Sequence, residues 1–281
     1  AGFETLAVFP AGKPDPFVPL VRDIGLPVET VVINNNVRTN TTVTEPDGTT
    51  TKLNGPGAPL SEQKLRSLEK VLIDALRPEV TWVVLAGSLP PGAPVDWYAR
   101  LTALIHEARS DVRVAVDTSD KPLMALGESL DTPGAAPNLI KPNGLELGQL
   151  ANTDGEELEA RAAQGDYDAI IAAADVLVNR GIEQVLVTLG AAGAVLVNAE
   201  GAWTATSPKI DVVSTVGAGD SALAGFVMAR SQKKTLEESL LNAVSYGSTA
   251  ASLPGTTIPR PDQLATAGAT VTQVKGLKES A

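Results

Sequence analysis

The sequence of 281 residues contains no cysteine and a single histidine, His106. Without cysteine the chain forms no disulfide and offers no thiolate to a metal, which fits a reducing compartment and predicts a cytoplasmic location. One histidine excludes a histidine-rich metal site, and we place it on a helix surface without a functional role. No apolar run reaches the length of a transmembrane helix and no signal peptide is visible, so no membrane partner is expected.

Positive charge is also scarce. The 22 Lys and Arg residues face 33 Asp and Glu, which gives a formal net charge of −11 and an isoelectric point near 4.6. A protein of this charge does not favour nucleic acid or anionic membranes as partners. Hydrophobic residues make up 43% and charged residues 20% of an otherwise ordinary globular composition. If its ligand is anionic, the protein must gather positive potential locally.

From residue 57 onward, short apolar runs alternate with helical patterns. This alternation predicts an α/β fold with a mostly parallel central sheet and helices on both faces. A β-hairpin is expected over 194–206. Strands are expected at 82–85, 112–116, 139–140 and 184–188, and helices at 61–76, 96–109, 123–130, 145–150, 167–179 and 236–252.

The stretch 28–56 has a different composition, rich in Thr and Asn. Strands are expected at 28–33, 37–45 and 49–54, the last two joined by the turn Pro46-Asp47-Gly48. Strands this polar suit a sheet with one face in water. We therefore interpret residues 28–56 as a small β lid, residues 1–27 as the start of the α/β core and residues 57–281 as the main α/β domain.

The most informative motif is Gly217-Ala218-Gly219-Asp220, which lies between an expected strand at 210–213 and an expected helix. The two glycines leave backbone N–H groups accessible, and the first turn of a helix attracts anions, so the turn can cradle a phosphate. Asp220 would then reach a group that attacks this phosphate. Alternatively, Asp220 only complements the N-terminus of its helix.

Polar residues also follow several expected strands, where ligands bind in open α/β sheets. Each has a structural alternative: Ser88 can simply end a strand, and Asn143 with Glu146 can cap a helix. Arg38 and Asn40 share one face of a lid strand and can grip one phosphate, unless Arg38 is a solvated edge residue. The candidates at strand ends are Ser88, Asp117, Lys141, Asn143, Glu146, Thr188 and Gly190.

The string Ser214-Thr-Val-Gly-Ala-Gly-Asp220-Ser, followed after two further residues by Ala-Gly-Phe226, resembles the C-terminal signature of the PfkB family of carbohydrate kinases, which have a ribokinase-like fold. Three further segments resemble family motifs: Gly87-Ser-Leu-Pro-Pro-Gly92, Lys141-Pro-Asn-Gly-Leu-Glu146 and Val187-Thr-Leu-Gly-Ala-Ala-Gly193. The resemblance spans nearly the whole chain.

The resemblance implies ATP-dependent phosphorylation of a phosphosugar, first of all fructose 1-phosphate to fructose 1,6-bisphosphate. Tagatose 6-phosphate and fructose 6-phosphate are alternative substrates. A catalytically silent sugar-phosphate-binding module is an alternative of another class. A nicotinamide-dependent dehydrogenase is disfavoured, because its glycine-rich turn should follow an early strand.

The resemblance also implies roles for individual residues. Asp220 would be the catalytic base, and Gly217, Ala218 and Gly219 would form the anion hole. The substrate phosphate would be held by Arg38, Asn40 and Ser88, and Mg²⁺ would be oriented by Asn143 and Glu146. The residues implied in binding ATP are Lys141, Asn143, Thr188, Gly190, Gly193 and, in the adenine pocket, Asn242.

Two further implications concern assembly and ions. Backbone carbonyls around Ser214, Val216 and the turn 252–256 would hold a monovalent cation such as K⁺. The lid would form the contact of a homodimer. Residues 57–281 would form the nucleotide-binding and catalytic domain.

The start of the chain departs from the family pattern. The family's first strand carries an Asp that binds sugar hydroxyls and is followed by a Gly-Gly-Lys-Gly-x-Asn segment, and neither occurs here. The sequence begins at Ala1 and leads directly into a strand-like stretch. We therefore expect the natural protein to be longer.

Overall fold

The computed structural model describes residues 2–44 and 50–274. They form a large unit, made of Val80–Gly87 and the chain from Tyr98 onward, and a small unit, made of Gly2–Glu79 and Ser88–Trp97. The segment 88–97 returns to the small unit because the Leu60 amide donates to the Pro91 carbonyl, 2.8 Å away. These units do not follow the bounds expected from the sequence, and the division into core, lid and main domain stays a prediction.

The large unit is built on a seven-stranded sheet of order β11-β10-β9-β8-β7-β6-β5. The pairs from β5 to β8 are parallel, whereas β8–β9, β9–β10 and β10–β11 are antiparallel. The prediction of a mostly parallel sheet was therefore wrong: the sheet is mixed, since the short turns after β8 and β9 allow only antiparallel return. The strands are β5 (Trp82–Ala86), β6 (Arg113–Asp117), β7 (Leu139–Ile140), β8 (Gln184–Thr188), β9 (Ala194–Asn198), β10 (Gly201–Ala205) and β11 (Val271–Val274).

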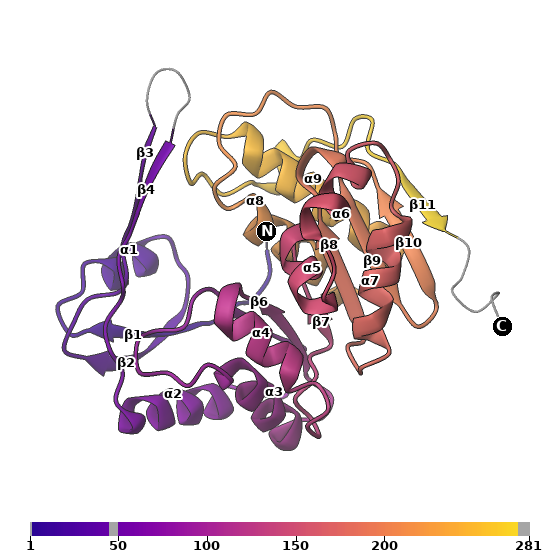
Figure 1. The fold of residues 1–281 in the computed structure, drawn as a ribbon. Coiled ribbons are helices and arrows are strands. Elements are labelled where there is room, and N and C mark those ends of the chain that lie inside the picture. Colours follow the sequence, from indigo (N-terminus) through magenta and orange to yellow (C-terminus); the bar gives the residue numbers. More distant parts are fainter. Residues whose placement is uncertain (1, 45–49, 275–281) are drawn as a thin grey trace. The chain divides into compact units, whose positions relative to one another are not determined.

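Helices cover both faces of this sheet, with α5 and α7 on one side and α8 and α9 on the other (Figure 1). Leu186, Leu196, Phe226 and Leu240 are fully buried between the sheet and the pair α8–α9. The sequence predicted most of these helices but missed α6. The helices are α3 (Trp97–Ala108), α4 (Asp120–Glu128), α5 (Gly144–Ala151), α6 (Gly155–Ala162), α7 (Asp168–Val178), α8 (Ala218–Ser231) and α9 (Leu236–Ser252), with a 3₁₀ turn at Gly190–Ala192 and another at Pro261–Gln263.

The small unit contains two separate two-stranded sheets. β1 (Ala7–Gly12) and β2 (Val28–Ile33) pair in parallel, connected by α1 (Phe17–Asp23). β3 (Asn40–Thr44) and β4 (Thr50–Asn54) form an antiparallel ribbon (Figure 1). The predicted turn Pro46-Asp47-Gly48 lies outside the described residues. Helix α2 (Glu62–Asp74) begins after Ser61, whose hydroxyl accepts the Lys64 amide and caps the helix.

The segment 210–213 is not a strand, which corrects the sequence interpretation. The amides of Val213 and Ser214 both donate to the carbonyl of Ala251, near the end of α9, and so do not join the sheet. Val212 and Val213 are 65% and 59% exposed. A β-branched composition favours extended backbone, but a strand needs a neighbouring strand edge, and in the described sheet β10 pairs with β9 and β11 instead.

The single histidine, His106, links two segments of the large unit through hydrogen bonds. His106 on α3 lies with Nδ1 3.0 Å from the Gly134 carbonyl and Nε2 3.2 Å from Asn138 Oδ1, which joins α3 to the segment before β7. It is partly buried rather than fully on the surface.

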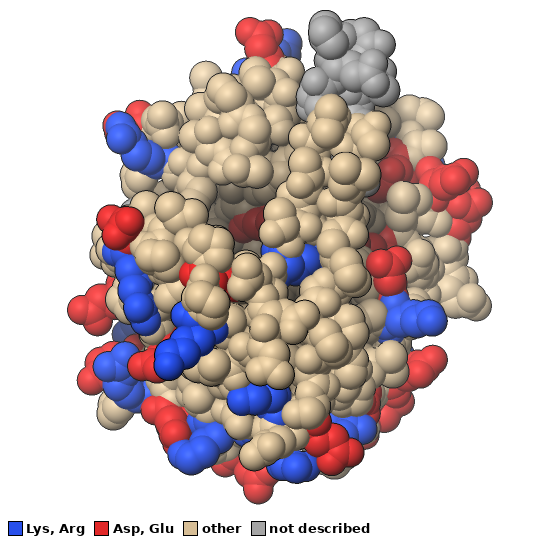
Figure 2. All heavy atoms as spheres, turned by 90° about the vertical axis from the view of Figure 1, so that its left-hand side faces the viewer, with Lys and Arg blue, Asp and Glu red and all other residues tan. Residues whose placement is uncertain are grey.

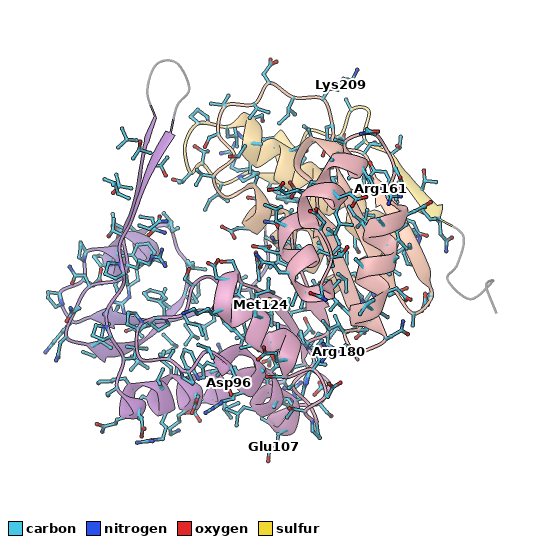
Figure 3. All side chains as sticks on the ribbon, viewed as in Figure 1. Asp96, Glu107, Met124, Arg161, Arg180 and Lys209 are labelled. Carbon is cyan, nitrogen blue, oxygen red and sulfur yellow. The ribbon has the colours of Figure 1, made fainter. Side chains whose placement is uncertain are left out.

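Surface charges are paired and mixed in sign. Arg161 pairs with Asp166 at 2.7 Å and Arg180 with Asp131 at 3.0 Å, and both arginines are labelled in Figure 3. On the face shown in Figure 2, basic and acidic side chains are interspersed. Within the described part of the chain, no helix combines the length and apolarity that crossing a bilayer requires.

Candidate active site

The motif Gly217-Ala218-Gly219-Asp220 forms the N-terminus of α8. Gly217 is the N-cap residue in a left-handed conformation, with φ of 76°, which glycine adopts without strain. Asp220 lies in the first turn and its side chain is exposed. The first-turn amides of a helix have no partner within the helix and, with the helix dipole, favour an anion. The local prediction of a turn that leads into a helix is confirmed.

A buried ion pair lies directly beside this turn. Lys141 Nζ is 3.2 Å from Asp117 Oδ1, and the two side chains are only 7% and 15% exposed. A Cβ atom added at Gly219 would lie 3.2 Å from the same Nζ, so the ammonium group is packed against the glycine turn. The pair therefore places a fixed positive charge next to the amides of α8.

The electrostatic surroundings of Asp117 are mixed. Burial raises the pKa of the Asp117 carboxyl group, the charge and hydrogen bond of Lys141 lower it, and the charge of Asp220 raises it again. The Tyr98 hydroxyl donates to the Gly87 carbonyl at 2.8 Å. Tyr98 also interacts electrostatically with the Asp117 carboxylate. Burial and, second, the charge of Asp117 raise the pKa of Tyr98 to about 12. Tyr98 therefore stays a hydrogen-bond donor that fixes the turn after β5.

Asn143 and Glu146 form a reciprocal cap at the start of α5. The Glu146 amide donates to Asn143 Oδ1 at 2.8 Å, and the Asn143 amide donates to Glu146 Oε2 at 2.9 Å. The structural alternative considered for this motif is thus present. The cap engages Oε2 of Glu146 and leaves Oε1 outside it. Burial raises the pKa of Glu146, while the Asn143 amide and the charge of Lys141 lower it.

Thr188, Gly190 and Gly193 lie in the turn that follows β8. Thr188 forms a parallel bridge with Asn143, so the ends of β7 and β8 lie side by side. Gly193 has φ of +96°, and a Cβ atom there would overlap the Ala205 carbonyl oxygen, so only glycine fits. Gly190 also has positive φ, and its carbonyl accepts the Ser207 hydroxyl at 3.1 Å.

Two other predicted residues lie on or near α9. Asn242 donates its side-chain amide to the Gly225 carbonyl of α8 at 2.6 Å, a contact between helices. Its proposed role at the adenine ring stays a prediction. Ser214 is joined through its amide to Ala251, which brings it to the end of α9 where the turn 252–256 begins.

The candidates for the substrate phosphate all belong to the small unit. Arg38 Nε donates to Asn40 Oδ1 at 2.8 Å, so these two exposed side chains are in contact. Arg38 precedes β3 rather than lying within it, and a shared grip on a phosphate stays a prediction. Ser88 is exposed and follows β5.

Sequence reasoning noted Asp117 at a strand end but gave it no role. Its partner was missed because the pair depends on strand register: Ala115 pairs with Leu139 and Val116 with Ile140, so Asp117 and Lys141 continue that alignment. The available signal was an acid and a base, each one position beyond an expected strand.

Comparison with known proteins gives the same family as the motifs. The family model of the pfkB family carbohydrate kinases matches residues 1–263. A 1-phosphofructokinase of Rhodobacter capsulatus is 35% identical over 237 residues, which cover 84% of this chain and 69% of that protein. The ATP-dependent 6-phosphofructokinase isozyme 2 of Escherichia coli is 33% identical over 262 residues, which cover 91% and 78%.

A solved structure agrees with these relatives. The crystal structure of phosphofructokinase-2 from Escherichia coli in complex with potassium superposes with a TM-score of 0.80 at 31% identity, covering 93% of this chain and 80% of that one. The fold is accordingly ribokinase-like, with a mixed central sheet and two small separate sheets. On the family model and these relatives together, the chain belongs to the pfkB family of carbohydrate kinases.

Proposed function

We propose that the protein transfers the γ-phosphoryl group of ATP to a hydroxyl group of a phosphosugar, with fructose 1-phosphate as the preferred substrate. The observation that carries the proposal is the intact Gly217–Asp220 turn at the N-terminus of α8, with the Lys141 ammonium group packed against it. The similarity to 1-phosphofructokinases supports the choice of fructose 1-phosphate. The similarity to a 6-phosphofructokinase of comparable identity keeps fructose 6-phosphate as a second candidate.

In the proposed reaction, Asp220 accepts the proton of the attacking hydroxyl group. The hydroxyl oxygen then forms a bond to the γ-phosphorus, the bond from that phosphorus to the bridging oxygen breaks, and ADP leaves. The amides of the α8 turn and the Lys141 ammonium group stabilise the charge on the transferring group, the main task in phosphoryl transfer. Arg38, Asn40 and Ser88 hold the substrate's own phosphate.

The residues at the start of α5 fit a magnesium ion. Mg²⁺ usually keeps several waters and is held by one or two carboxylates together with substrate phosphates. Glu146 engages Oε2 in the cap of α5, so Oε1 is available to hold a water of the ion, oriented by the helix start. Asn143 would act with it. Bound there, the ion would supply positive charge against the phosphates.

Further binding roles follow from the family. Thr188, Gly190 and Gly193 would contact the ATP phosphates, and Asn242 the adenine side. The junction between Ser214 and the end of α9 would hold K⁺, in line with the potassium complex of the Escherichia coli protein. Dimerisation through the ribbon β3–β4 is part of the same proposal.

The substrate is tested by following ADP release from MgATP by the full-length protein. Fructose 1-phosphate, fructose 6-phosphate and tagatose 6-phosphate are compared under identical conditions. We expect kcat/KM to be highest for fructose 1-phosphate. Binding of ATP without turnover of any of the three would instead favour a silent binding module.

Replacing Glu146 with Gln separates its two roles. The amide oxygen of Gln can still accept the Asn143 N–H, so the helix cap and thermal stability should persist. Loss of the charge should raise the Mg²⁺ concentration for half-maximal activity roughly tenfold, as expected when an ion loses an orienting ligand. The measurement is a Mg²⁺ titration of the initial rate.

Glu238 provides a matched control. It occupies the same position in the cap of α9, where its Oε2 accepts the Thr235 amide at 2.9 Å. Glu238→Gln should leave the Mg²⁺ dependence unchanged. A Glu146 variant that behaves like the Glu238 variant would reduce Glu146 to a capping residue.

A further inference from the structure

Asp15 is unusual among the acidic residues that the structure describes, because it alone is almost fully buried, with 3% of its surface exposed. It lies in the turn between β1 and α1, where its amide donates to the Gly12 carbonyl at 3.2 Å. A buried carboxylate is costly unless its oxygens are hydrogen-bonded. Its contacts therefore indicate what the group does.

Both carboxylate oxygens of Asp15 accept backbone amides. Oδ1 accepts the amide of Phe17, the first residue of α1, at 2.9 Å. Oδ2 accepts the amide of Val37 at 2.6 Å. Hydrogen bonds to an ionised group are short and roughly twice as strong as neutral ones. The carboxylate thus ties the start of α1 to the residue that immediately precedes Arg38.

The segment 37–40 is also held at its other end. The Gly55 amide donates to the Thr39 carbonyl at 3.1 Å, and a Cβ atom at Gly55 would lie 2.8 Å from that oxygen. Gly12 allows a similar approach on the upstream side, since a Cβ atom there would lie 2.9 Å from the Asn35 carbonyl oxygen. Between these fixed points the Arg38 guanidinium group donates to Asn40 Oδ1.

We infer that Asp15 is a positioning residue for the phosphate grip, by which we mean the side chains of Arg38 and Asn40. Through the Val37 amide, the carboxylate fixes the direction in which the backbone enters Arg38. The guanidinium fork is then already oriented toward a phosphate dianion before the ligand binds, which lowers the entropy lost on binding. The inference rests on the proposed function, which assigns Arg38 to the substrate's phosphate.

The test is Asp15→Asn, which keeps the size of the side chain. The amide can accept only one of the two N–H groups and presents its own donors to the other. We expect KM for the preferred phosphosugar to rise about tenfold, because a displaced Arg38 costs substrate binding. We expect kcat to stay within about twofold and the Kd for MgATP to stay unchanged, since neither depends on the grip.

Asp154→Asn is the matched control. Asp154 caps α6 in the large unit and also accepts two backbone amides, those of Glu156 and Glu157. Both amides bond to Oδ1, an oxygen that Asn keeps, and Asn caps helices as well as Asp does, so Asp154→Asn should leave the melting temperature nearly unchanged and KM unchanged. If Asp15→Asn does not fold, Asp15→Glu is the second variant to test. It keeps the charge but moves it by one methylene, and it should also raise KM for the phosphosugar. A folded Asp15 variant with lower stability and unchanged KM would overturn the inference.

A double-mutant cycle with Arg38→Ala separates the inference from the proposed function. Arg38→Ala should raise KM for the phosphosugar, and in that background Asp15→Asn should add less than about a twofold change. If Arg38→Ala has no effect on KM, the assignment of the grip fails and the inference fails with it. If Arg38→Ala raises KM but Asp15→Asn does not, only the inference is overturned.

Discussion

Asp220→Asn should lower kcat by roughly a thousandfold while the protein still binds MgATP. An Asn side chain has the shape of Asp but cannot accept the proton of the attacking hydroxyl, and general-base catalysis typically contributes a factor of about 10² to 10⁴. Since the amides of the α8 turn are unchanged, we expect the Kd for MgATP to stay within about threefold. Steady-state ADP release and a calorimetric titration with MgATP measure the two quantities.

Asp168→Asn is the control for this substitution. Asp168 occupies the first turn of α7 as Asp220 occupies that of α8, so both variants remove a carboxylate that complements a helix dipole. Only the Asp220 variant should lose turnover. Retention of more than about a tenth of wild-type kcat would show that Asp220 is not the base.

Lys141→Met should have the largest effect on stability. The substitution leaves the Asp117 carboxylate buried without its cation, and breaking a buried pair in this way typically costs about 3–5 kcal/mol. Met keeps the apolar volume of the Lys side chain, so cavity formation contributes little. Urea denaturation at pH 8 should show the loss, and the rate of ADP release should fall as well.

The loss of stability in the Lys141→Met variant should depend on pH in a predictable direction. Burial raises the pKa of Asp117 even in the presence of Lys141, which lowers it. Without Lys141 the pKa rises further, so the folded state binds a proton that the unfolded state releases. Stability is then lost as pH increases through the raised pKa and recovers at lower pH. The Lys141→Met variant should therefore lie closer to the wild type at pH 5 than at pH 8.

The double variant Asp117→Asn/Lys141→Met removes both charges. It should recover much of the stability at pH 8, because no uncompensated charge remains buried. A loss that is independent of pH, and that Asp117→Asn does not relieve, would indicate that Lys141 contributes through packing alone.

Local patterns in the sequence were sufficient for most elements. Helix α9 and strands β2 and β8 begin and end at the predicted residues. Asn143 and Glu146, three residues apart, form the helix cap that was considered as their structural role. These features depend on residues close in sequence, so composition and spacing determine them.

Features that depend on distant contacts were not predictable in the same way. Residues 210–213 have strand composition but bond to the end of α9 instead of joining a sheet. Helix α6 was missed because its exposed Glu residues resemble a loop in composition. The pairing of Lys141 with Asp117 required the register between β6 and β7.

The ribbon β3–β4 has a consequence for measured affinities. It has only two strands, and Val43 and Leu53 are 48% and 59% exposed, so little apolar surface holds it closed. Two-stranded ribbons of this kind are marginally stable, and their amide protons should exchange with solvent well before those of the seven-stranded sheet. Asn40 is the first residue of this ribbon. A ligand that contacts Asn40 binds only the closed ribbon, so any open fraction of the ribbon raises the apparent dissociation constant of the phosphosugar.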